Sequence, residues 1–161
     1  MQVANFLASG GLLLAFALGT RRAEHRSTSS GRLMGVIGLG LIGAGIFACD
    51  PIGGYPPGTP PRPESASLRG ALHQLFSSFV FLGLPALLVN EARHTRNCWP
   101  VYSTATCVMF LGSFAISSAG FAQTPGLVRV GGLFQRLALS AGFLWLTARA
   151  ARLLRELDAN E

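Results

Sequence analysis

The chain has 161 residues, of which half are apolar and only 12% are charged. A soluble domain carries about 25% charged residues, so most of this protein's surface does not face water. The mean hydropathy of +0.43 also excludes a disordered protein, a disulfide-rich secreted scaffold and an ordinary cytosolic enzyme domain. The composition predicts an integral membrane protein.

The net charge of +6 comes from thirteen basic residues, all of them arginine, against seven acidic ones. A nucleic-acid-binding domain gathers its basic residues on one polar face with aromatic residues between them. Here the arginines form short clusters between long apolar segments. We therefore expect no nucleic-acid partner, and we expect membrane lipids to be the main partners.

Five segments approach the roughly 20 apolar residues, rising about 1.5 Å each, that a transmembrane helix needs. In chain order they cover residues 3–19, 33–48, 72–89, 101–119 and 133–154. The second segment is short and rich in glycine, which is typical of a membrane helix buried among its neighbours. The pattern predicts one all-α domain, a polytopic bundle of five transmembrane helices.

Small residues recur on one face of the first segment, at Ala4, Ala8, Gly11, Ala15 and Gly19. The second segment has the same spacing of four at Gly40, Ala44 and Ala48. Such faces let membrane helices approach closely. We expect them to pack against another helix, a protein partner or a second copy of the chain. The alternative is that segments rich in glycine and alanine produce this spacing by chance.

The arginines favour alternate connections between the segments. Four lie between the first and second segments, two between the third and fourth, and three in the C-terminal tail. The positive-inside rule places these regions in the cytoplasm. We therefore expect a multi-pass protein of the bacterial inner (plasma) membrane, with its N-terminus outside and its C-terminus, a solvated helix end, inside. No basic residue precedes the first segment, and this favours a natural unit of six helices that has one more helix upstream.

Three cysteines are too few and too widely spaced for a disulfide framework. Cys49 and Cys98 are expected at opposite ends of the bundle, and Cys107 lies about 13 Å deeper than Cys98 along its helix. The C-x-x-C spacing of a metal site is absent from the sequence. We expect free thiols, and we expect neither a metal nor a cofactor.

Residues 50–64 hold six of the nine prolines. Proline lacks a backbone N–H and fixes φ, so this segment is expected to be a stiff, extended loop on the outer side. It is either a rigid spacer between two helices or a lid or docking surface, with Tyr55 and Thr59 as candidate contact residues.

Several motifs together resemble the bacterial membrane-protein family called domain of unknown function 998. They are D-P at 50–51, G-Y-P-P-G-T-P at 54–60, G-A-L-H at 70–73, W-P-V-Y-S at 99–103 and G-L-F-Q-R at 132–136. The resemblance covers nearly the whole chain, and Q-V-A-N-F at 2–6 is similar to the start of the family's second helix. It implies the fold and the membrane location, and it implies no activity, ligand or catalytic residue.

Six polar residues are predicted to meet at the outer ends of their helices: Gln2, Asn5, Asp50, His73, Gln135 and Arg136. A guanidinium without a partner at that depth costs on the order of 2 to 3 kcal/mol. Asp50 is the nearest acid, and we expect it to pair with Arg136, with His73 and Gln135 beside the pair. This cluster is either a structural clasp joining the second, third and fifth helices, a site for an anionic headgroup or small solute, or a catalytic site.

The leading interpretation is a non-catalytic membrane module whose outer clasp or pocket binds a lipid headgroup, a small solute or a partner protein. The alternative is a transport or channel component that uses Asp50, His73 and Arg136 as a polar relay. A remote alternative is an intramembrane hydrolase with Ser113 as nucleophile and His73 as base, which requires the two side chains to meet.

Overall fold

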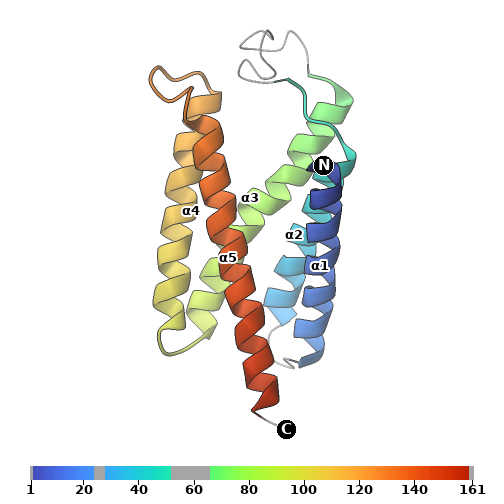
Figure 1. Cartoon of the computed structure of the whole chain (residues 1–161), viewed down its shortest axis with the longest axis vertical. Coiled ribbons are helices and arrows are strands. Elements are labelled where there is room, and N and C mark those ends of the chain that lie inside the picture. The colour runs from blue at the N-terminus through green and yellow to red at the C-terminus, as the bar shows by residue number, and fades with distance from the viewer. Residues whose placement is uncertain (1, 24–27, 52–65, 160–161) are drawn as a thin grey trace.

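A computed structural model describes residues 2–23, 28–51 and 66–159 (Figure 1). They form five α-helices, which are α1 (Gln2–Ala23), α2 (Thr28–Ile46), α3 (Leu68–His94), α4 (Trp99–Phe121) and α5 (Gly131–Asp158). All five are long and apolar enough to cross a membrane. The predicted all-α bundle of five helices is therefore confirmed, and the chain is a multi-pass membrane protein.

The helices differ from the predicted segments mainly at their ends. Helix α5 continues to Asp158, and α3 begins at Leu68 and runs to His94. Each is about 40 Å long, which exceeds the roughly 30 Å hydrocarbon core of a bilayer. Polar residues can therefore extend both helices beyond the apolar core. Helix α2 was predicted to reach Ala48 and ends at Ile46 instead.

The helices form two antiparallel hairpins joined by a diagonal helix (Figure 1). Helices α1 and α2 make one hairpin, and α4 and α5 make the other. Helix α3 starts beside α2 at one end of the bundle and crosses to α4 at the other (Figure 1). Helices α1 and α5 touch only marginally. The two hairpins are therefore held together mainly through α3.

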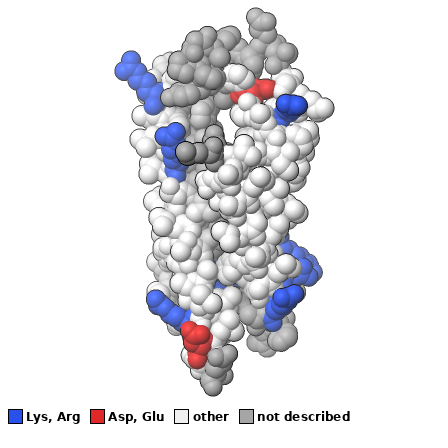
Figure 2. All heavy atoms as spheres, turned by 45° about the vertical axis from the view of Figure 1, so that its right-hand side comes forward, with Lys and Arg blue, Asp and Glu red and all other residues white. Residues whose placement is uncertain are grey.

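The two ends of the bundle differ in charge. The arginine-rich end is the one where α1, α3 and α5 finish, and it carries Arg21, Arg22, Arg93, Arg96, Arg149, Arg152 and Arg155. The opposite end, named here the Asp50 end, contains Asp50, the start of α1 and the 122–130 connection (Figure 1). Figure 2 shows a broad uncharged band between these ends on one face. This band is the surface expected to face lipid tails.

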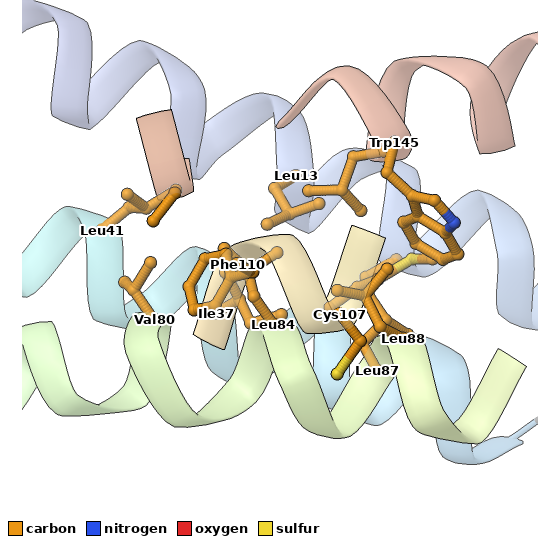
Figure 3. Packing of buried hydrophobic residues seen from close by; sticks show 14 of the residues in the cluster. Leu13, Ile37, Leu41, Val80, Leu84, Leu87, Leu88, Cys107, Phe110 and Trp145 are labelled. Atoms are coloured by element: carbon orange, nitrogen blue, oxygen red, sulfur yellow. The ribbon is translucent and has the colours of Figure 1, made fainter. Parts of the chain in front are cut away.

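A continuous apolar core joins all five helices (Figure 3). Its largest fully buried side chains include Ile37 of α2, Leu84 of α3, Phe110 of α4 and Trp145 of α5. Helix α2 is the most buried of the five. Of the residues in its most apolar stretch, 56% are buried inside the bundle, compared with 22% for α1. The expectation that the glycine-rich second helix is buried is confirmed.

The small residues of α1 do not face the bundle. The expectation that they pack against another helix of this chain is therefore wrong. The stripe of Ala4, Ala8, Gly11, Ala15 and Gly19 is exposed along its length. The close approach to α2 uses Gly10 instead, whose added Cβ would lie 2.8 Å from the carbonyl oxygen of Gly38. In α2, Gly40 and Ala44 are buried as expected, and Ala48 lies beyond the helix end and is exposed.

Gly40 provides a test of the contact between α2 and α3. A Cβ at this position would lie 2.8 Å from the backbone oxygen of Phe76, and backbone cannot move aside as a flexible side chain can. We predict that Gly40→Ala lowers the free energy of unfolding by about 1 to 3 kcal/mol. Reversible unfolding in mixed micelles measures the change.

Gly11→Ala is the matched control, because a Cβ there meets nothing within 4 Å. Alanine also favours helix over glycine, so the control should be neutral or slightly stabilising. Equal losses of stability in the two variants would contradict the packing described for α2 and α3.

Candidate functional site

A buried polar cluster links α2, α3 and α5 near the arginine-rich end, and we name it the inner clasp. Arg149 donates from Nε to Oε2 of Glu91 at 3.0 Å, and Ser30 donates from Oγ to Oε1 of the same carboxylate at 2.7 Å. Asn90 donates from Nδ2 to the Ser30 hydroxyl at 2.9 Å. The Glu91 and Arg149 side chains are only 3% and 5% exposed. Both oxygens of a buried carboxylate are thus bound.

Two members of the inner clasp, Glu91 and Arg149, extend the buried faces of their helices. Glu91 follows Leu84, Leu87 and Leu88 on α3, and Arg149 follows Trp145 on α5. These spacings of three and four put the residues on one helix face. The prediction that Arg149 lies in a solvated helix end is wrong, because α5 continues its buried face past that residue to Leu153. The spacing was the signal that could have identified Arg149.

Aromatic side chains pack beside the inner clasp and join α4 to α5. Trp145 donates from its indole nitrogen to the buried hydroxyl of Ser103 at 3.0 Å. Its ring lies 5.6 Å from that of Trp99, over which the guanidinium of Arg152 sits at 5.2 Å. The inner clasp and these contacts therefore fix the second hairpin to α3 at the arginine-rich end.

Asp50 has a local role at the opposite end of the bundle. Its carboxylate accepts hydrogen bonds from the backbone N–H and the hydroxyl of Ser67, at 2.8 and 2.5 Å. Ser67 is the N-cap of α3, and its Oγ accepts from the N–H of Gly70. The side-chain and backbone hydrogen bonds from Ser67 hold the pKa of Asp50 below its ordinary value. A carboxylate is also favoured at a helix N-terminus.

His73 binds the end of α2. Its Nδ1 lies 3.0 Å from the carbonyl oxygen of Ala44 and 2.9 Å from that of Phe47. Carbonyl oxygens only accept hydrogen bonds, so Nδ1 carries the proton and donates to both. The last carbonyls of a helix lack partners within the helix, and His73 supplies one. The imidazole thus joins α3 to α2.

A groove of about 570 Å³ lies where α1 and α5 face each other with little direct contact. Its lining consists of Asn5, Phe6, Ser9, Leu41, Arg136, Leu139, Ser140, Phe143, Leu144 and Thr147. Asn5, Arg136 and Leu144 are exposed, so the groove opens on the surface of the bundle. We name it the side groove.

The side groove brings together two of the predicted polar residues, Asn5 and Arg136. The expected pair between Asp50 and Arg136 is not formed, because Ser67 binds the carboxylate and the guanidinium lines the groove. Gln135 is half-buried next to Arg136 in α5. Gln2 begins α1, but its side chain lies outside the described part of the structure, as do Tyr55 and Thr59.

The chemistry of these groups supports binding and packing. His73 donates to carbonyl oxygens of α2, and no described contact joins it to Ser113, which is buried in α4. A serine nucleophile needs a base within hydrogen-bond reach.

Cys49, Cys98 and Cys107 are free thiols, as predicted. The side groove, with one cation and several hydroxyl and amide groups, is the arrangement best suited to hold a ligand.

A comparison with known families places the chain beside a family of membrane proteins. A family model described as protein of unknown function (DUF998) matches residues 1–152. This match confirms the resemblance inferred from the sequence motifs. No curated protein and no solved structure matches the chain.

The role of Asp50 can be tested by titration. Its folded-state pKa is depressed, so the stability it contributes is present above the ordinary pKa of about 3.9 and is lost as pH falls through the folded-state pKa. We predict that Ser67→Ala raises the pKa of Asp50 toward its ordinary value. NMR of the side-chain carboxyl carbon of Asp50 in labelled protein, followed over a pH titration, measures that pKa.

Arg136→Gln serves as the comparison for this titration and should leave the pKa of Asp50 unchanged. If the pKa of Asp50 instead rises in Arg136→Gln and does not change in Ser67→Ala, Asp50 is paired with Arg136 and not with Ser67. That result would contradict the contact described here.

Because the carboxylate of Glu91 is buried in the inner clasp, removing its charge should lower the stability of the protein strongly. Glu91→Gln removes the negative charge beside Arg149, and we expect it to reduce the free energy of unfolding by on the order of 3 kcal/mol. The control is Glu156→Gln, because Glu156 pairs with Arg152 at 2.6 Å on the exposed side of α5. Exposed pairs contribute about 0 to 1 kcal/mol. Similar small losses in both variants, measured by unfolding in mixed micelles, would show that the buried pair is not important for stability.

Proposed function

The chain belongs to the DUF998 family of proteins of unknown function, and from this starting point we propose that it is a non-catalytic binding module of the membrane. In this proposal the side groove takes up an amphiphilic ligand directly from the bilayer. The observation that carries the proposal is a groove of about 570 Å³ with polar and apolar walls that opens on the bundle surface.

The size and lining of the side groove support this proposal. Pockets for small ligands have volumes of about 300 to 1,000 Å³ and combine apolar walls with a few polar groups. Phe6, Leu41 and Phe143 supply apolar wall, and Asn5 and Ser140 supply polar groups. A ligand with both a polar and an apolar part would satisfy both kinds of wall.

The asymmetry of the bundle also favours binding at this place. The inner clasp joins the α4–α5 hairpin to α3 and α2 near the arginine-rich end. The side groove separates the same hairpin from α1 along α5, beginning near the Asp50 end. A fixed contact on one side gives the groove a preformed shape, which reduces the entropy lost when a ligand binds.

We further propose that the arginine-rich end faces the cytoplasm of a bacterial inner membrane. The clusters at Arg21 and Arg22, at Arg93 and Arg96, and in the last turns of α5 all lie at this end. Positively charged connections are retained in the cytoplasm. The N-terminus of this chain then lies on the outer side of the membrane. The end of the side groove that contains Asn5 and Arg136 lies in the outer leaflet.

The alternative of transport through a relay of Asp50, His73 and Arg136 receives less support. Ser67 binds Asp50, carbonyl oxygens of α2 bind His73, and Arg136 lines the side groove. Within the described ranges, no hydrogen bond or ion pair connects these three residues. A relay requires such a chain of contacts, so binding is the function that the geometry favours.

Filling the side groove tests the proposed function. Ser140 lies in the groove wall and is exposed, so we predict that Ser140→Trp occupies the space of the ligand. Native mass spectrometry of protein purified in mild detergent with membrane lipid added should show one retained amphiphile on the unmodified protein. The Ser140→Trp variant should retain at least about tenfold less.

Ser118→Trp is the matched control, because Ser118 is an exposed serine of α4 outside the groove whose hydroxyl bonds only its own helix. This variant should retain the amphiphile as the unmodified protein does. If the unmodified protein retains none, or if both variants lose it equally, the side groove is not a binding site for amphiphiles.

A further inference from the structure

We infer that the ligand of the side groove is an anionic phospholipid, whose phosphate binds Arg136 and Ser140 and whose acyl chain follows α5 toward Thr147. This inference rests on the proposed function and names the class of ligand. It depends on the charge in the groove, on the depth of that charge and on the length of the groove.

The charge of the side groove selects the sign of the headgroup. Arg136 is the one charged side chain among the described lining residues, and no described carboxylate lies within ion-pair distance of it. Ser140 lies four residues later, which puts its hydroxyl on the same face of α5. A guanidinium beside a hydroxyl is a donor set that suits a phosphate, because both groups can donate to its oxygens.

The depth of Arg136 matches the level of lipid phosphates. Helix α5 is about 42 Å long, so roughly 6 Å of it extends beyond a 30 Å hydrocarbon core at each end if the helix is centred. Arg136 lies five residues after Gly131, or about 7.5 Å along the axis. Its Cα is then close to the boundary of the core, and the long side chain can reach the headgroup layer.

The length of the side groove matches one leaflet. The lining residues of α5 run from Arg136 to Thr147, which is eleven residues or about 16 Å along the helix. One leaflet of the hydrocarbon core is about 15 Å thick. Leu139, Phe143 and Leu144 occupy the span between these two residues. The groove therefore has a cation at the headgroup level and apolar wall down to the middle of the membrane.

An arginine at a helix end can also extend toward the annular headgroups of any lipid. A bound phospholipid differs from that case in stoichiometry and selectivity. It gives one retained lipid that prefers a negative headgroup, whereas annular contact gives many weakly held lipids. The experiment below measures both properties on the full chain.

Phosphatidylglycerol and phosphatidylcholine with the same acyl chains are the two probes, compared by native mass spectrometry of the detergent-solubilised protein. The unmodified protein should bind one phosphatidylglycerol at least about tenfold more tightly than phosphatidylcholine, as expected for a charge-assisted contact. Arg136→Gln should reduce this ratio to nearly one, and Arg136→Lys should keep part of it. Arg129→Gln, at an exposed arginine of the 122–130 connection outside the groove, should leave the ratio unchanged.

The outcomes separate this inference from the proposed function. One retained lipid with no preference for a negative headgroup overturns the inference and leaves the proposed function standing. No retained lipid of either kind overturns both. Equal loss of the ratio in Arg136→Gln and Arg129→Gln assigns the preference to general surface charge and overturns the inference.

Inorganic phosphate distinguishes a lipid headgroup from a free anion. Millimolar phosphate should displace little phosphatidylglycerol, because it cannot occupy the apolar part of the groove. Displacement of the lipid by phosphate at equal concentration would make the groove a site for a soluble anion and would overturn the inference. The melting temperature of each variant shows whether it is folded.

Discussion

The buried ion pair between Glu91 and Arg149 is the contact on which the arrangement of the helices depends. Two charges inside a membrane domain carry a large desolvation penalty unless hydrogen bonds satisfy them. Ser30 supplies a further donor to the carboxylate, and its own hydroxyl is bound by Asn90. The pair thereby connects α2, α3 and α5, which are distant in sequence, at one end of the bundle.

The contacts that α5 makes differ between its two sides. Helix α3 crosses from one hairpin to the other (Figure 1), and the inner clasp fixes α5 against it near the arginine-rich end. Helices α1 and α5 meet only marginally, and the side groove lies between them. A packed core of five helices (Figure 3) therefore coexists with an open groove on the bundle surface that has both polar and apolar walls.

The sequence predicts the five helices because each apolar segment approaches the length that a bilayer requires. It also predicts an ion pair between Asp50 and Arg136, and this prediction is wrong. The ion pair that does form joins Glu91 to Arg149 at the opposite end of the bundle. Asp50 binds Ser67, seventeen residues away across the proline-rich connection, and sequence patterns do not place that connection in space. Arg149 was predicted to lie in a solvated helix end because it belongs to the basic C-terminal cluster, although its spacing from Trp145 puts it on the buried face.

The most direct test of this account is a double-mutant cycle on the inner clasp. Unfolding free energies are measured for Glu91→Gln, Arg149→Met, the double variant and the unmodified protein, with the exposed pair of Arg152 and Glu156 as a second cycle. We predict a coupling above about 1 kcal/mol for the buried pair and below about 0.5 kcal/mol for the exposed one. Additive effects of Glu91→Gln and Arg149→Met within about 0.5 kcal/mol would contradict the claim that this ion pair holds the two hairpins together.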